Sequence, residues 1–326
     1  MANTQFPIDA VITWVDGNDE RHKAKRMKYG NTAMFQAEDI AGNTRYASVG
    51  EIFYCIASLN KFAPWLNKIY IVTDEQDPKV TEFIKKHFPQ RQIPIEIVDH
   101  KTIFKGYEEY LPTFNSIAIE SMTWRIPGLS EHYIEFNDDF FLSAPTVPED
   151  FFTPDNRVVC YGKRGCLFLV RMTRIIKRRK NGEKKVTFKE LMLNAASQLG
   201  NKFLFIKIYH TPRALLKSVY EKFFAEHQEE LIKNISYRFR HYKQYIPQEI
   251  QALQLYNEGR CILREAHGNL LYLKPKESTG YIRKKLELFT SLPKFKFCCI
   301  NSLDQASEGI QKSVTAWIEQ RLGLKK

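Results

Sequence analysis

The sequence predicts an α/β protein with a Rossmann-like, largely parallel sheet and a helical insertion. Short runs of β-branched and aromatic residues alternate with helical apolar patterns through residues 9–136, and this alternation is typical of parallel sheets. Polar clusters follow the first and last of these runs, where ligand-binding groups lie at the carboxyl ends of parallel strands. Long helical patterns dominate the second half, so we expect the insertion there.

The first half contains four expected strands and three expected helices. The strands are at 9–15, 68–73, 93–98 and 132–136. The helices are at 45–62, 79–88 and 115–126. Pro64 follows the first helical pattern at the distance expected beyond a helix end.

The second half opens with a basic run at 171–190. A helical pattern follows from 212 to 256, then a strand at 296–300 and an amphipathic helix at 307–321. We therefore expect a sheet domain of residues 1–170 and 260–326, with the last strand completing the sheet. Residues 171–259 form the expected insertion, a basic loop and helices that carry His210 and Arg240.

Composition limits the function classes. The chain has 326 residues, 44% of them hydrophobic, which suffices for a sizeable core and argues against disorder. Lys and Arg number 49 against 37 Asp and Glu, a net charge of +12. This excess indicates an anionic partner, although a basic surface that only confers solubility would look the same.

The six cysteines form no CxxC pair, so a zinc ribbon is not expected. Met1 to Pro7 does not resemble a secretory signal, and no apolar run reaches the ~18 residues of a membrane span. We therefore expect a reducing, cytoplasmic setting, with buried thiols at Cys298 and Cys299.

The first cluster with chemical potential is Trp14-Val15-Asp16-Gly17-Asn18-Asp19, after the first expected strand. Glycine lets backbone amides approach a ligand, and carboxylates can hold ribose or base atoms. A plain turn is the alternative. There is no GxGxxG and no GxxxxGK[ST], so ordinary dinucleotide and P-loop sites are disfavoured.

The second cluster is Phe136-Asn137-Asp138-Asp139-Phe140. Adjacent carboxylates among apolar residues are costly unless they are paired or bind a metal. Such oxygens suit Mg²⁺ or Mn²⁺ on a diphosphate, and one aspartate could instead be a general base. A helix cap or turn is the structural alternative.

Two further clusters contain cations suited to phosphate. His210 lies in Tyr209-His210-Thr211-Pro212-Arg213, which we expect at a strand-to-helix boundary, where a helix amino-terminus favours anions. Arg240 lies in Arg238-Phe239-Arg240-His241, whose forked donors fit phosphate. A structural histidine and a solvated basic helix face are the alternatives.

The order and the residues of these clusters resemble the conserved regions of the Stealth family. This family includes bacterial capsule and cell-wall polysaccharide phosphotransferases and the GlcNAc-1-phosphotransferase that tags lysosomal enzymes. The resemblance has four regions. They are the opening IDAVITWVDGND, the stretch from RYASVGEIFYC through HYIEFNDDFFL, the part from His210 to His241, and Phe297-Cys298-Cys299-Ile300-Asn301.

The resemblance implies a GT-A-like fold, a nucleotide-sugar donor that is commonly UDP-linked, a glycan acceptor, and help from Mg²⁺ or Mn²⁺. Asp139 matches the catalytic base, and His210 and Arg240 match residues at the donor phosphates, with His210 protonated. Glu51 lies in a family motif without a clear role. The implied donor-binding residues are Trp14, Asp16, Gly17, Asn18, Arg45, Asn115 and Asn301.

The chain departs from the family pattern after Asn301. Relatives often place an acidic residue directly after that asparagine, but Ser302 and Leu303 follow it here. Asp304 is the nearest carboxylate, so the implied metal ligands are Asp138, Asp139 and Asp304.

The resemblance therefore implies a phosphotransferase that moves a hexose-1-phosphate to a glycan hydroxyl in capsule or surface polysaccharide synthesis. A metal-dependent glycosyltransferase that releases a nucleoside diphosphate is the nearest alternative. A polyanion-binding protein would explain the charge but not the acidic strand end. The net charge also favours loose contact between the basic residues at 171–185 and the inner face of an anionic membrane.

Overall fold

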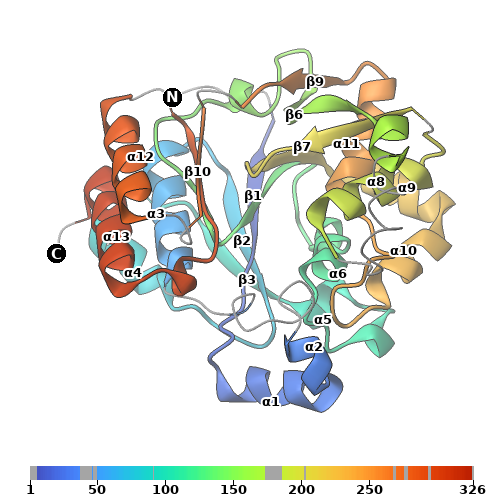
Figure 1. The fold of residues 1–326 in the computed structure, drawn as a ribbon, viewed down its shortest axis with the longest axis horizontal. Helices are drawn as coiled ribbons and strands as arrows, with labels where there is room; N and C mark the ends of the chain where they lie inside the picture. Colours follow the sequence, from blue (N-terminus) through green and yellow to red (C-terminus); the bar gives the residue numbers. More distant parts are fainter. Residues whose placement is uncertain are drawn as a thin grey trace.

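The computed structural model describes residues 6–36, 46, 50–90, 92–172, 186–201, 203–266, 269–274, 278–292 and 295–324. Its central feature is a five-stranded sheet in the order β3-β2-β1-β4-β8, with helices on both sides (Figure 1). The strands are β1 (Ile8–Thr13), β2 (Lys68–Thr73), β3 (Ile95–Asp99), β4 (His132–Asn137) and β8 (Arg213–Leu216).

This main sheet confirms the α/β class and the largely parallel topology. β1, β2, β3 and β4 are parallel to their neighbours, and only β8 runs antiparallel, against β4. The four parallel strands have the 3-2-1-4 order found in doubly wound sheets, in which ligands bind outside the carboxyl ends of the strands.

Helices cover both faces of the sheet because successive residues of a strand point to opposite faces. Ile8, Ala10 and Ile12 of β1 belong to one core cluster, which includes residues of α3 (Glu51–Phe62), α12 (Thr279–Ser291) and α13 (Glu308–Leu322). Val11, between them, belongs to a second cluster. That cluster includes residues of α5 (His100–Ile103), α6 (Ser116–Glu120), α9 (Lys217–Glu226), α10 (Gln228–Ile235) and α11 (Pro247–Asn257).

Two small sheets extend the architecture. One has the order β10-β11-β5, from β10 (Leu270–Leu273), β11 (Phe297–Ile300) and β5 (Phe140–Leu142). The other has the order β7-β6-β9, from β7 (Leu204–Ile208), β6 (Val158–Cys166) and β9 (Cys261–Arg264). The remaining α-helices with full bounds are α1 (Glu20–Tyr29), α2 (Thr32–Gln36), α4 (Val80–His87) and α8 (Phe188–Gln198).

Two expectations about the second half are wrong. The last strand, β11, does not complete the main sheet, because it pairs with β5 and β10 instead. The helical pattern over 212–256 begins with strand β8 and is interrupted by a non-helical segment at 236–246. A four-residue segment such as Arg213–Leu216, with three apolar residues, fits a buried strand as well as a helix turn, so periodicity could not separate the two.

The segment expected as an insertion contributes to the sheets. Its residues 213–216 supply β8 to the main sheet, and 204–208 supply β7 to a small sheet. Most of the basic run at 171–190 lies outside the described residues, which resume at 186. No helix in the described ranges has both the length and the apolar character needed to cross a bilayer.

Candidate active site

A cavity of about 590 Å³ opens where the chain leaves β1, β4 and β11. Thr13, the last residue of β1, lies opposite Asn137, the last residue of β4, so the loops after these strands start side by side. The cavity wall includes sequence-predicted site residues from every part of the chain. They are Trp14, Asp138, Asp139, His210, Arg240, Asn301 and Asp304.

The Asn137–Asp139 turn is held from two sides by thiols. The Cys299 thiol of β11 donates to Asp139 Oδ2 at 3.7 Å, and the Cys55 thiol of α3 donates to the carbonyl of Asn137 at 3.9 Å. The Ile300 amide also donates to the carbonyl of Asp139 at 3.1 Å. Asp139 Oδ1 and Asn137 Oδ1 are buried without a hydrogen-bond partner, so both oxygens are available to a ligand.

Both carboxyl groups of this turn have raised pKa values. Burial, the neighbouring Asp139 and Glu51 raise the pKa of Asp138 well above its usual range. Burial and Glu51 raise the pKa of Asp139 to about 7, while Arg213 and the Cys299 thiol oppose that rise. A carboxylate poised near neutral pH suits a general base.

His210 lies between β7 and β8, so the expectation of a strand-to-helix boundary is wrong. Its ring stacks on Tyr272, with centroids 4.7 Å apart and planes 5° apart, and on Phe188 at 5.4 Å. Burial and the neighbouring cations Arg213, Lys274 and Lys207 lower its pKa to about 4. The ligand-free chain therefore holds His210 neutral at pH 7, contrary to the expected protonated form.

Arg240 reaches the cavity from the segment between α10 and α11 rather than from a helix face. Its Nη2 donates to Ser116 Oγ at 2.7 Å, and this contact anchors one arm of the guanidinium group. Burial lowers its pKa from the usual arginine value.

Arg213 is a second cavity cation, which lies in the same cluster as His210 but was not among the predicted site residues. Its side chain is 9% exposed, and its Nη1 lies 3.5 Å from Glu135 Oε1, a loose ion pair. Its Nε is buried without a partner. Arg213 follows His210 by three residues in the motif already singled out, and that proximity was the available signal.

Other residues missed at the sequence level are Glu120 and Lys274, which also line the cavity with Glu51. Glu120 comes from α6 and Lys274 directly follows β10. Neither residue belongs to a recognisable cluster in the sequence, because the fold brings them to the cavity from distant segments.

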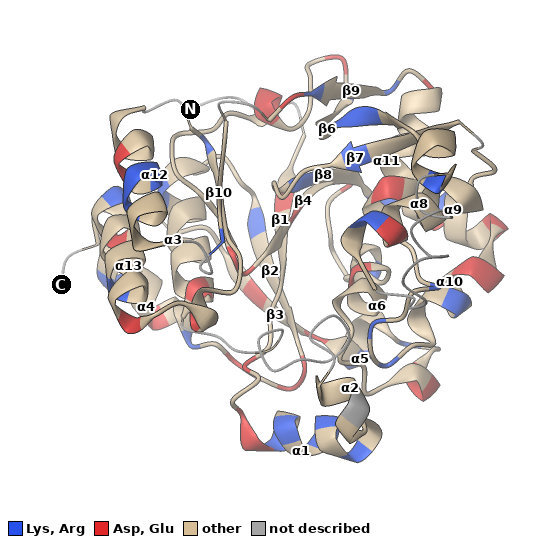
Figure 2. Ribbon diagram, in the orientation of Figure 1, with Lys and Arg blue, Asp and Glu red and all other residues tan. Residues whose placement is uncertain are grey.

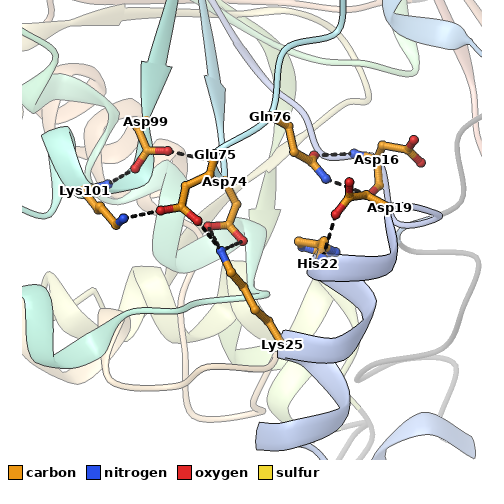
Figure 3. Close-up of polar contacts among 9 residues, drawn as sticks. All are labelled: Asp16, Asp19, His22, Lys25, Asp74, Glu75, Gln76, Asp99 and Lys101. Atoms are coloured by element: carbon orange, nitrogen blue, oxygen red, sulfur yellow. Dashed lines mark hydrogen bonds and ion pairs between the residues drawn. The ribbon is translucent and has the colours of Figure 1, made fainter.

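The loop after β1 is fixed by contacts that Figure 3 shows. The Gln76 side chain forms two hydrogen bonds with the Asp16 backbone, accepting from its amide at 2.8 Å and donating to its carbonyl at 3.0 Å. Lys25 of α1 bonds Asp74 and Glu75, so it also joins the β1 side to the loop after β2 (Figure 3). These contacts tie together the loops that follow β1 and β2.

Several expected donor-binding residues lie around this loop without lining the cavity. Asp16 Oδ1 accepts from the Asn18 amide at 2.8 Å, and the Gly17 amide donates to the carbonyl of Tyr46 at 2.8 Å. A Cβ at Gly17 would lie 2.2 Å from Tyr46 atoms, so only glycine fits there. Asp16, Gly17 and Asn18 therefore shape the loop that carries Trp14 into the cavity wall.

Asn115 has a structural position. It is fully buried, caps α6 by accepting from the Ile117 amide, and donates to the carbonyl of Tyr237 and to Gln244 Oε1. These bonds hold α6 against the segment that carries Arg240. The other expected donor-binding residue, Arg45, lies outside the described residues.

The oxygen atoms of the Asn137–Asp139 turn fit a hard divalent cation. Asp139 Oδ1 and Asn137 Oδ1 are the buried atoms without partners, and Asp304 lines the same cavity. Mg²⁺ keeps several water ligands and needs few carboxylates. Among the described residues, no group of three or more His, Cys, Asp or Glu side chains is arranged to hold a metal ion.

Comparison with known proteins gives two family matches. Residues 6–33 match the Stealth protein conserved region 1, and residues 45–159 match the Stealth protein conserved region 2. The expected third and fourth regions stay a prediction. The match to conserved region 2 contains the whole segment from α3 to the acidic turn of the cavity.

Individual relatives agree with the family matches. The chain is 34% identical to the capsular polysaccharide phosphotransferase fcs1 of Haemophilus influenzae over 251 residues, 74% of this chain and 62% of that protein. It is 43% identical to the exopolysaccharide phosphotransferase SCO6021 of Streptomyces coelicolor over 150 residues, 46% of this chain and 26% of that protein.

Among solved structures, the chain is similar to the galactosyltransferase LgtC, with a TM-score of 0.46 and 9% identity. That similarity covers 97% of this chain and 95% of the LgtC chain. The chain therefore carries the Stealth conserved regions 1 and 2 along most of its first half, and its relatives by sequence are named as polysaccharide phosphotransferases.

Proposed function

We propose that this chain is a phosphotransferase of capsule or surface polysaccharide synthesis. It transfers a hexose-1-phosphate, such as GlcNAc-1-phosphate, from a nucleotide-diphosphate sugar to a hydroxyl of a glycan acceptor. The observation that carries this proposal is the meeting of a buried carboxylate, Asp139, with Arg213, Arg240 and His210 around one cavity. The names of the relatives support the same activity.

The cavity residues suit attack at phosphorus. Asp139 Oδ1 accepts the proton of the acceptor hydroxyl, and the resulting oxygen nucleophile attacks the phosphorus that carries the sugar. The bond from that phosphorus to the bridging oxygen breaks, and the nucleoside monophosphate leaves with the electron pair. Arg213 and Arg240 stabilise the charge on the phosphoryl oxygens and on the leaving oxygen.

His210 and the acidic turn have supporting roles in this proposal. Neutral His210 donates one ring N–H to the donor phosphates, and stacking between Phe188 and Tyr272 fixes its ring plane. A bound Mg²⁺ or Mn²⁺ would supply further positive charge at the diphosphate. Asp138 and Asp304 are the residues we propose to hold it, because Asp139 Oδ1 accepts the proton of the acceptor hydroxyl. Trp14 and Asn301 contact a donor that we expect to be UDP-linked.

Incubation with a panel of nucleotide sugars and a glycan acceptor tests the proposal. We expect acceptor-dependent release of nucleotide from one donor, and a loss of about 10³-fold in turnover with Asp139→Asn, which keeps the shape but removes the base. Binding of the donor to the variant, measured by calorimetry, should persist. Unchanged turnover in Asp139→Asn would remove Asp139 from the role of base.

We further propose peripheral contact with an anionic membrane. Lys163, Arg164 and Arg171 are exposed on and just after β6, and Lys207 on β7 lies opposite Lys163. Figure 2 shows Lys and Arg positions along the ribbons of β6 and β7. Exposed apolar side chains lie in the same region, with Phe168 55% and Phe203 73% exposed.

Vesicle sedimentation tests this contact. Each surface cation contributes about 1 kcal/mol near an anionic membrane, and salt screens that attraction. We expect retention on phosphatidylglycerol vesicles at low salt, weaker retention at high salt, and weaker retention for Lys163→Glu combined with Lys207→Glu. If anionic and neutral vesicles leave the same fraction of protein unbound at low salt, the proposed contact is wrong.

A further inference from the structure

The two oxygens of the Asp139 carboxylate have different surroundings. Oδ2 accepts a hydrogen bond from the Cys299 thiol at 3.7 Å, and Oδ1 is buried without a partner at the cavity wall. Cys299 is 0% exposed, so water does not compete for its thiol. The Asp139 carboxylate is therefore held through one oxygen and open through the other.

The backbone of the acidic turn is held independently of this thiol. The Ile300 amide donates to the carbonyl of Asp139, and the Cys55 thiol donates to the carbonyl of Asn137. Loss of the Cys299 thiol would leave these contacts in place. It would remove a restraint on the rotation of the Asp139 carboxylate about its last side-chain bond, which has a broad torsional preference of its own.

We propose that Cys299 is a positioning residue for the transfer reaction, because its thiol holds Asp139 Oδ2 and thereby aims Oδ1 at the acceptor hydroxyl. This inference rests on the proposed role of Asp139 as the base. A thiol is a weak hydrogen-bond donor, so it orients the carboxylate but lowers its basicity less than a stronger donor would. Strand β11 thus contributes Cys299 to the site, and Asn301, the first residue after the strand, lines the same cavity.

The adjacent Cys298 is a natural control. It is 1% exposed and lies on the same strand, but successive strand residues face opposite sides. Cys299 lies opposite Phe140 and Tyr272 in the small sheet, and Cys298 lies opposite Phe141 and Leu271. Substitution of Cys298 should therefore disturb packing to a similar extent without touching the Asp139 carboxylate.

The test compares Cys299→Ala, Cys299→Ser, Cys298→Ala and Cys298→Ser in the transfer assay. We expect kcat to fall about tenfold in Cys299→Ala, the size of effect that loss of one hydrogen bond to a charged group gives. The donor KM should change less than about twofold, because misalignment of a base leaves ground-state binding intact. Cys299→Ser should restore most of kcat, whereas both Cys298 variants should keep wild-type kcat.

Further variants distinguish a failure of the positioning role from a failure of the proposed base and from a loss of folding. Cys299→Ala added to Asp139→Asn should cause no additional loss, because the thiol acts only through that carboxylate. If Cys299→Ala does not fold, the pair Cys299→Thr and Cys299→Val differs only in a hydroxyl donor, and kcat should be higher for Thr. Equal kcat for Cys299→Ala and Cys299→Ser, or for Cys299→Thr and Cys299→Val, would overturn the positioning role. The proposed base would stand if Asp139→Asn still lowers turnover about 10³-fold.

Discussion

At the scale of single residues, the two arginines of the cavity differ in how the protein holds them. Arg213 lies beside the buried Glu135, whereas Nη2 of Arg240 donates to a neutral hydroxyl, Ser116 Oγ. The Ser116 hydroxyl anchors the guanidinium group of Arg240 at the cavity. This difference makes Arg240 the more direct test of the cation cluster.

We expect Arg240→Lys to lower turnover about 10²-fold although the charge is conserved. A lysine cannot bond Ser116 and an oxygen of the phosphoryl group through one planar fork. Steady-state kinetics with the natural donor measures the effect, and Arg283→Lys, at an exposed position on α12, is the matched control. Near wild-type turnover in Arg240→Lys would contradict a forked contact with phosphate.

Another residue-scale prediction concerns acid stability. His100 is fully buried at the start of α5, neither ring nitrogen has a hydrogen-bond partner, and burial lowers its pKa to about 4. Asp74 and Asp99 oppose this shift, and His22 and Lys25 add to it. His100 therefore becomes protonated near pH 6.5 in the unfolded chain but only near pH 4 in the folded chain.

The free energy of unfolding should consequently keep its full value above pH 6.5 and fall as the pH drops from 6.5 towards 4. The loss from this one group approaches about 3 kcal/mol at pH 4. Urea unfolding of wild type and His100→Asn at pH 7 and pH 4.5 measures it, with the exposed His227→Asn as control. The variant should lose less stability between the two pH values, and an identical loss in all three proteins would contradict the prediction.

The same scale shows what the sequence could and could not reveal about the site. Asp138, Asp139, His210 and Arg240 were found because they stand in recognisable clusters, and all four line one cavity. Cys299 lies in the last region of the resemblance, residues 297–301. Its hydrogen bond to Asp139 depends on the pairing of β5 with β11, which no local sequence pattern encodes. The neutral state of His210 also required the fold, because its pKa depends on burial and on cations that include Lys274, which follows the distant strand β10.

At the scale of elements, the loop after β1 depends on a side chain from the loop after β2. The Gln76 amide pairs with both backbone groups of Asp16, much as a neighbouring strand would (Figure 3). Trp14 and Val15, directly before Asp16, line the cavity. The position of this wall therefore follows from Gln76 together with the Gly17–Tyr46 contact.

We expect Gln76→Ala to raise the donor KM about tenfold with little change in kcat. Two lost hydrogen bonds loosen the loop that binds the donor, while the acidic turn and the arginines stay in place. Lys79→Ala is the control, because Lys79 is exposed and pairs with Asp77 in the same connection. A fall in kcat at constant KM would show that the loop acts on the chemical step rather than on donor binding.

Elements of the first half were predictable, and several of the second were not. The strands at 68–73 and 132–136 agree with β2 and β4, because continuous apolar runs between turn clusters mark buried parallel strands. Strand β8 escaped recognition because four residues, Arg213–Leu216, run directly into helix α9. Its strand state comes from pairing with β4, a tertiary effect that local periodicity does not contain.

At the scale of the whole molecule, the cavity is assembled from segments that are far apart in the chain. The parallel strands β1 and β4 place two loops side by side, β8 brings Arg213 beside β4, and β11 supplies Cys299 from the far end of the sequence. The proposed base Asp139 meets the cations Arg213 and Arg240 and the carboxyl groups of Asp138 and Asp304 there. Phosphoryl transfer needs mainly positioning and charge stabilisation, and this arrangement supplies both.

The central claim is that the enzyme cleaves the bond between the bridging oxygen and the sugar-bearing phosphorus rather than the anomeric bond of the sugar. The same residues could serve glycosyl transfer, but the products of the two reactions differ. The decisive measurement is chromatography of the spent nucleotide together with phosphorus NMR of the acceptor product. We predict one equivalent of nucleoside monophosphate and one new phosphodiester for each transfer. Stoichiometric release of nucleoside diphosphate with a phosphorus-free product would contradict the claim.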